Sequence, residues 1–178
     1  MARTVPVATT ESPGLFVTSA LWNAQVAALN SFLTAVPVFV GYATSVQSIP
    51  SGNVMTALNL DTELLDADGG HSTVTNTSRY TPTVAGLYLV IGSVGWPANN
   101  TGDRRLQVGL NGGGVVGSGA SYDPTSGVTN GMQTVSTVTC NGSTDYIEVM
   151  AAQASGSALS TIAGGIFSAA MRVFWISR

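Results

Sequence analysis

The stretch RYTPTVAGLYLVIGSVG, residues 79–95, decides the fold class of this chain. Polar and apolar residues alternate after Pro82, and Gly86 precedes LYLVI, a run of residues that favour strands. A turn followed by such a run is typical of a β-strand. The sequence therefore predicts a strand over residues 86–96.

Strand-like segments of this kind recur from residue 38 to the end of the chain, separated by turn sequences such as IPSGN, NNTGD and DPTSG. The other predicted strands cover residues 38–45, 53–66, 72–82, 104–113, 132–142, 145–155 and 166–177. Residues 112–131 are rich in Gly and Ser and predict a long surface loop. About eight short antiparallel strands predict an all-β sandwich or jelly roll over residues 38–178.

A single helix is predicted before this head domain, within residues 17–37. Thr18 is placed to cap its start and Pro37 to end it. Large apolar residues follow at spacings of 4, 3, 4 and 3, a heptad pattern: Trp22, Val26, Leu29, Leu33 and Val36. Two interpretations remain open: one helix packed on its own domain, or a short parallel bundle between identical chains. Two heptads are too short to be stable alone.

The composition is poor in charge. Charged residues make up 8% of the 178 residues, against about 25% in an ordinary soluble domain, and lysine is absent. Either much surface is buried between subunits, or the genome is GC-rich. The net charge is −3 and only Arg104 and Arg105 are adjacent cations, so no nucleic-acid partner is expected.

Residues 1–16 are polar and Thr-rich, with Pro6 and Pro13, and predict an extended N-terminal arm without a core of its own. They lack the apolar run of a signal peptide. No apolar run elsewhere is long enough to insert in a membrane. Cys140 is the single cysteine, so a disulfide within the chain is impossible and cytosolic synthesis is expected.

The predicted strands 38–178 resemble the trimeric C1q/TNF-like jelly-roll superfamily. The resemblance rests on Tyr80, Pro82 and Gly86–Val90, on STVTCNGSTDYIEVMA (136–151), and on the closing FSAAMRVFWI (167–176). It implies a homotrimer of mainly β jelly-roll heads. It also implies residues in the core or at the trimer interface, with the last strand beside the subunit axis: Tyr80, Tyr88, Met171, Phe174 and Trp175.

The segment GLFVTSALWNAQVAALNSFL (14–33) resembles the N-terminal helix of tailed-phage virion proteins, especially from phages of actinobacteria. The two resemblances together imply a trimeric virion protein, docked on other virion proteins by residues 1–16. A minor tail or tail-tip protein is preferred, with loops 97–103 and 112–131 contacting host glycans. The alternatives are a capsid decoration protein or head fibre and, more remotely, a secreted lectin-like adhesin.

Catalytic chemistry has little support in this sequence. His71 is the only histidine and lies in a Gly-rich turn, and no cationic group is placed to activate Cys140. The chain is therefore expected not to be an enzyme. The sequence DADGG partly resembles a calcium loop, with Asp66 and Asp68 as candidate ligands, but the fifth position is glycine and the closing glutamate is missing. The alternative is an acidic turn whose aspartates bind local backbone N–H groups.

Overall fold

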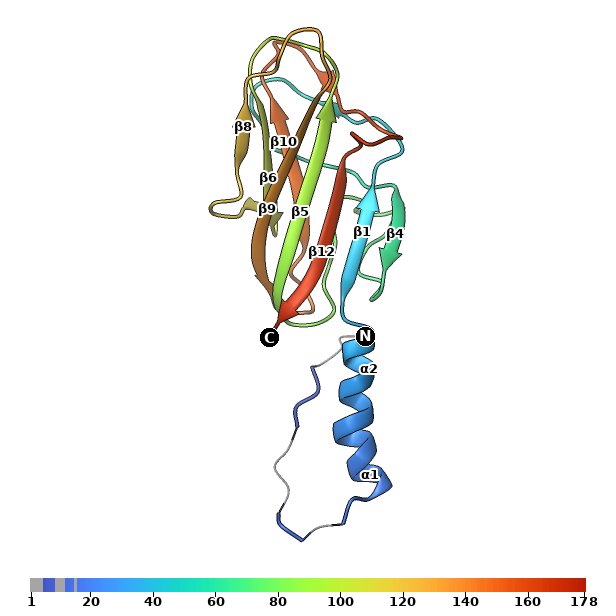
Figure 1. Cartoon of the computed structure of the whole chain (residues 1–178). Coiled ribbons are helices and arrows are strands. Elements are labelled where there is room, and N and C mark those ends of the chain that lie inside the picture. Colours follow the sequence, from blue (N-terminus) through green and yellow to red (C-terminus); the bar gives the residue numbers. More distant parts are fainter. Residues whose placement is uncertain (1–4, 9–11, 15) are drawn as a thin grey trace.

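A single helix stands below a β-sandwich in the computed structural model, which describes residues 5–8, 12–14 and 16–178 (Figure 1). The helix runs without interruption through α1 (Ser19–Trp22), η1 (Asn23–Ala27) and α2 (Ala28–Thr34). Thr18 caps it as predicted, because its hydroxyl accepts a hydrogen bond from the Leu21 N–H at 3.2 Å. The π-helical turn η1, closed by the Ala28 N–H and the Asn23 carbonyl, was not predicted.

The sandwich consists of two antiparallel sheets, which face each other in Figure 1. The first sheet has the order β4-β1-β12-β5-β9: Thr62–Asp66, Val38–Tyr42, Ala170–Ser177, Gly86–Trp96 and Asn130–Cys140. The second has the order β3-β10-β6-β7, with β8 also paired to β6: Thr56–Ala57, Ile147–Gln153, Arg104–Leu110, Gly113–Gly114 and Ala120–Tyr122. A short ribbon joins β2 (Ser48–Ile49) to β11 (Leu159–Ser160).

The core fills the space between the sheets. Strand β5 alternates buried and half-buried residues along most of its length, so Tyr88 and Val90 point inward. The sheets approach closely at Gly92, where an added Cβ would lie only 2.7 Å from a methyl group of Val149. Glycine is therefore required at this point of β5 for close packing.

Two expectations about local structure are wrong. Residues 72–82 form turns, with only a single β-bridge between Tyr80 and Ile147. The hydroxyl of Ser72 accepts hydrogen bonds from the backbone N–H groups of Val74 and Thr75, and such local bonds compete with strand pairing. Residues 112–131 are not entirely loop, because they contain β7 and β8. The hairpin into β7 turns at Asn111 and Gly112, both with positive φ, as Asn-Gly hairpins prefer.

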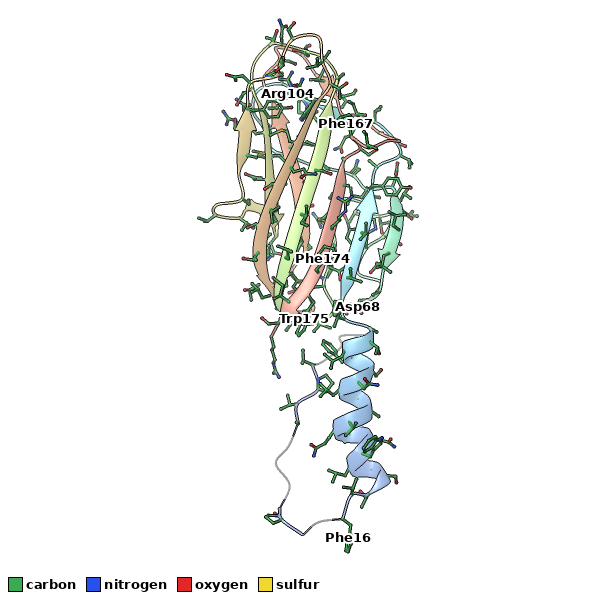
Figure 2. The ribbon with its side chains drawn as sticks, viewed as in Figure 1. Phe16, Asp68, Arg104, Phe167, Phe174 and Trp175 are labelled. Atoms are coloured by element: carbon green, nitrogen blue, oxygen red, sulfur yellow. The ribbon has the colours of Figure 1, made fainter. Side chains whose placement is uncertain are left out.

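The helix contacts the head through a residue outside the heptad pattern. Phe32 is buried, and its ring meets that of Trp175 edge-on, with 5.2 Å between centroids. Trp175 lies at the base of the sandwich, above the end of the helix (Figure 2). Its indole N–H also points at the Ala85 carbonyl, at 3.4 Å. Phe32 and Trp175 thus join helix and head while leaving the heptad residues Trp22, Val26, Leu29 and Leu33 uncovered.

Candidate interaction surfaces

The outer face of the first sheet, the side away from the core, carries large apolar residues in rows across the strands. One row follows the register Leu65, Val40, Arg172, Ile91 and Val135 from β4 to β9. We call it the middle row. Four of its five side chains are apolar, and Val135 is 56% exposed. When one face of an antiparallel sheet is in water, the strand residues on that face are normally polar.

A second row lies nearer the base of the sandwich and contains Val38, Phe174, Leu89 and Thr137. Figure 2 shows Phe174 low on this sheet and Phe167 near its upper end. Phe167 lies against Gly95 and Gly131, where added side chains would collide with it. The outer face is therefore apolar in these two rows and at Phe167, while the row that lies between the middle row and Phe167 contains the polar Tyr42, Ser93 and Gln133.

The residues expected in the core or at the trimer interface lie in different places in the structure. Tyr80, Tyr88 and Met171 are wholly buried between the sheets. Of the two places expected for Met171, the structure gives the core, so this side chain does not line an axis between subunits. Phe174, which alternates with the buried Val173, lies on the outer face. Trp175 packs beside the core and against Phe32.

The helix presents a second apolar surface. The side chains of Trp22, Val26, Leu29 and Leu33 are 54%, 43%, 38% and 61% exposed. These four line one hollow of about 440 Å³ along the helix, so the heptad pattern does fall on one side. Val36 is half-buried at the junction with the head. Only the end of the helix meets the sandwich, so the helix packs on its own domain through Phe32 while these four side chains stay uncovered by the head (Figure 1).

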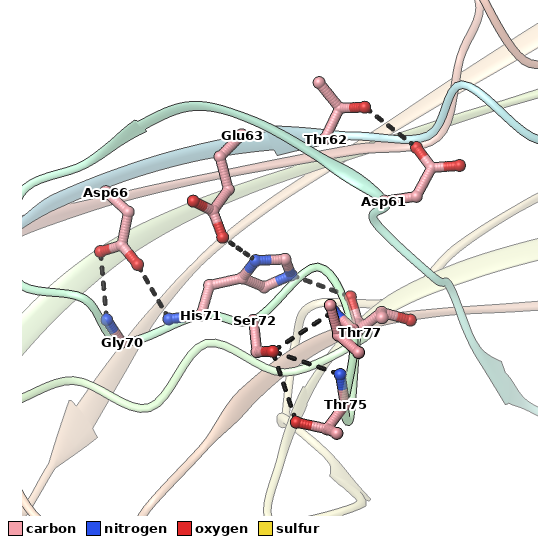
Figure 3. A network of polar contacts seen from close by, with 10 residues as sticks. Asp61, Thr62, Glu63, Asp66, Gly70, His71, Ser72, Thr75 and Thr77 are labelled. Carbon is pink, nitrogen blue, oxygen red and sulfur yellow. Dashed lines mark hydrogen bonds and ion pairs between the residues drawn. The ribbon is translucent and has the colours of Figure 1, made fainter.

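The acidic turn is stabilised by its own hydrogen bonds (Figure 3). The carboxylate of Asp66 accepts from the backbone N–H groups of Gly70 at 3.1 Å and His71 at 2.9 Å. Asp68 accepts from the Thr83 hydroxyl at 2.7 Å. No group of three or more His, Cys, Asp or Glu that could hold a metal occurs among the described residues. These contacts match the capped acidic turn, and the two aspartates have separate protein partners.

His71 and Cys140 are both buried parts of the folded domain. The His71 side chain is fully buried, with Nδ1 2.7 Å from a Glu63 oxygen and Nε2 2.9 Å from the Thr77 carbonyl. Its ring also lies against Phe39. Burial raises the pKa of the Cys140 thiol to about 12, with a further contribution from Asp145. A protonated, buried thiol is not a nucleophile.

Two polar features of the surface were not predicted. A hollow of about 460 Å³ is lined by Arg79 and Tyr146, with the guanidinium 4.1 Å from the ring centroid and Nε 3.3 Å from Glu148. The loop 97–103 is held by the fully buried Arg104, which donates to the carbonyls of Asn99, Thr101 and Asp103. The contact between Arg79 and Glu148 joins segments 69 residues apart, which sequence spacing does not reveal. The contacts of Arg104 are local, and the unpredicted feature there is the full burial of a charged side chain.

Asp61 joins the turn after β1 to the start of β4. Its carboxylate accepts from the backbone N–H groups of Thr44 at 2.6 Å and Ser45 at 2.9 Å, and from the hydroxyls of Thr44 and Thr62. Desolvation by burial acts to raise the pKa of Asp61, but these hydrogen bonds outweigh it and lower the pKa from 3.8 to about 2.

This shift predicts a pH-dependent stability. Because the pKa is lower in the folded state, the ionised Asp61 stabilises the fold above pH 3.8, and that contribution is lost as the pH falls toward 2. The full contribution is about 2 kcal/mol. Urea unfolding at several pH values should show Asp61→Asn to be destabilised at neutral pH and to lose less stability on acidification than the unmodified chain. The control Asp123→Asn, at an exposed site, should retain the unmodified pH profile.

The described residues contain no helix long and apolar enough to cross a membrane. No protein-family model matches the sequence, and no curated protein matches it. Solved structures do match. The globular domain of zebrafish complement 1qA protein has a TM-score of 0.57 at 14% identity, over 80% of this chain and 98% of that one. Murine APRIL at pH 8.5 has a TM-score of 0.57 at 13% identity, over 78% and 98%.

These similarities show the fold class. The chain is a mainly β, two-sheet antiparallel sandwich of the C1q/TNF-like jelly-roll type, preceded by one helix. The fold predicted from the strand pattern and the closing segment is therefore confirmed. At this level of identity the similarity concerns the fold and not a ligand or a partner.

Proposed function

We propose that this protein is a non-enzymatic structural subunit of a bacteriophage virion, which assembles as a homotrimer with a helical stalk and a jelly-roll head. A minor tail or tail-tip protein is the preferred placement. The observation that carries the proposal is the apolar outer face of the first sheet, whose strand residues include one charged side chain, Arg172. Contiguous apolar patches on a surface mark protein–protein interfaces.

The helix supports the same assembly. Its heptad residues are uncovered in one chain, and a helix of this length needs packing to be stable in water. A parallel bundle of three copies would bury Trp22, Val26, Leu29 and Leu33 against one another. The heads would hold the chains together while the stalk supplies this additional contact.

The phage assignment rests on the resemblance of residues 14–33 to virion proteins and on the lysine-free composition. In this proposal residues 1–16 dock on another virion protein. Three arms on one trimer make each later contact intramolecular, so weak individual contacts hold firmly. Loop 97–103, organised by Arg104, would be presented at the far end of the head for contact with host glycans.

The stalk yields a specific prediction. Leu29→Asp places like charges at one layer of the proposed bundle, at a cost of several kcal/mol per unpaired buried charge. We expect the helical circular dichroism signal to fall while the molecular mass of the trimer is retained. Ala24→Asp, which introduces the same charge at an exposed position outside the apolar hollow, should leave the signal nearly unchanged. Equal loss in both variants would reflect helix propensity and not bundle packing.

Docking tests the virion function itself. Purified protein is added to phage particles that lack it, and co-sedimentation is measured for the full chain and for a chain without residues 2–16. A further control replaces residues 2–16 by a Gly/Ser segment of the same length. We expect both altered chains to stay folded and to lose binding. If they bind as well as the full chain, the arm is not the docking element, and a decoration protein lying flat on the capsid becomes the better account.

A further inference from the structure

Arg172 is a single charge at the centre of an uncharged face. It lies on β12, the central strand of the five in the first sheet, with Val40 and Ile91 as its neighbours in the middle row. Its side chain is half-buried, and its guanidinium forms no hydrogen bond or ion pair with any of the described residues. In a single chain, water solvates this group.

Most carboxylates in the described part of the chain already have hydrogen-bond partners away from Arg172. The outer-face residues of these strands include no acid. Away from that face, acidic side chains already accept hydrogen bonds or ion pairs from their own chain: Asp61, Glu63, Asp66, Asp68, Asp103, Asp145 and Glu148. Asp123, after β8, is the described acid without such a contact. A second copy therefore offers few carboxylates to neutralise Arg172.

Polar groups accompany the guanidinium. Arg172 borders two hollows of about 410 and 210 Å³, and Ser93 and Ser168 line both. Ser168 is 95% buried, and its oxygen accepts a hydrogen bond from the Gly165 N–H at 2.9 Å. Its hydroxyl proton thus remains available to donate. Gln133 lines the larger hollow and Tyr42 the smaller.

We propose that Arg172, with the hydroxyls of Ser93 and Ser168, binds an inorganic oxyanion of the phosphate or sulfate class at the interface between subunits. This inference rests on the trimer proposed above. Covering the face would remove water from an unpaired guanidinium, which costs several kcal/mol. A guanidinium matches the oxygen geometry of phosphate, and such a pair strengthens where water is excluded. The anion thus makes assembly compatible with a charge at the centre of the interface.

The test measures the concentration at which the full-length trimer dissociates, by sedimentation equilibrium, in sodium phosphate or in sodium chloride of matched ionic strength. We expect phosphate to lower the trimer dissociation constant by roughly tenfold for each site filled at ten times its Kd. The concentration at which the trimer dissociates should then fall by about threefold per site, because it varies as the square root of that constant. Arg172→Leu should remove the difference between the two salts and remain trimeric. Arg178→Leu, which removes a charge beyond the end of β12, should keep the response of the unmodified chain.

Three other results would each contradict a different part of this proposal. If the unmodified trimer dissociates equally in both salts, no oxyanion is bound. If Arg172→Leu and Asp123→Asn each weaken the trimer in both salts, the partner of Arg172 is Asp123 of a neighbouring copy, and the anion is excluded. A protein that is monomeric under every condition contradicts the trimer itself, and not only the anion site.

Discussion

Leu89→Lys should convert the proposed trimer into folded monomers. Leu89 lies between Phe174 and Thr137 on the outer face, in the row next to the middle row. Burying an unpaired ammonium group at an interface costs several kcal/mol per site, and each trimer contains three such sites. Lysine is preferred to aspartate here because a carboxylate could pair with Arg172 in the adjacent row. Light scattering and circular dichroism measure mass and fold separately.

The matched control for this change is Val116→Lys. Val116 is 98% exposed in the connection between β7 and β8, away from the first sheet. The Val116→Lys substitution introduces the same charge as Leu89→Lys and should leave the trimer intact. If Leu89→Lys remains trimeric at the concentrations at which the unmodified chain does, the outer face is not the interface, even if the protein is a trimer.

Phe39→Ala is expected to cause the largest loss of stability within one chain. Phe39 is fully buried on β1, stacked on Tyr80 with 4.9 Å between ring centroids and 4.8 Å from the His71 ring. Removing a buried phenylalanine costs about 3–5 kcal/mol, through lost burial and the cavity that remains. The change also removes the surface on which the His71 ring and its bond to Glu63 are placed.

Urea unfolding should be measured in the monomeric Leu89→Lys background, because oligomer dissociation would otherwise contribute to the transition. Val40→Ala, one residue further along β1 but pointing outward, is the control and should cost much less in that monomer. A loss below about 1 kcal/mol for Phe39→Ala would mean that the contact between Phe39, Tyr80 and His71 is not a rigid part of the core.

Predictions from the sequence were most accurate for elements whose structure depends on one local segment. Strand β5 has the predicted bounds, because the alternating burial along Tyr88 and Val90 follows from strand geometry alone. The helix start also follows from a local rule, the cap at Thr18. The strand predicted over residues 72–82 is wrong, because the hydroxyl of Ser72 accepts local hydrogen bonds from the backbone in place of strand pairing. The polar composition of this segment allows such bonds.

The candidate surfaces required information that the sequence lacks. The closing strand reads AMRVFWIS, and either of its two alternating sets could face the core. Pairing with β5 and β1 puts Met171 inside and Arg172 and Phe174 outside. The apolar rows exist only once strands far apart in the chain are aligned. Phe32, which fixes the helix to Trp175, was not distinguished because it lies outside the heptad pattern.

The most direct test of the proposed assembly is the mass of the unmodified full-length protein in solution, measured by light scattering over a range of micromolar concentrations. The trimer proposed from the apolar outer face and the exposed helix predicts three times the chain mass of 18.1 kDa. A stable species of a single chain mass across that range would contradict it.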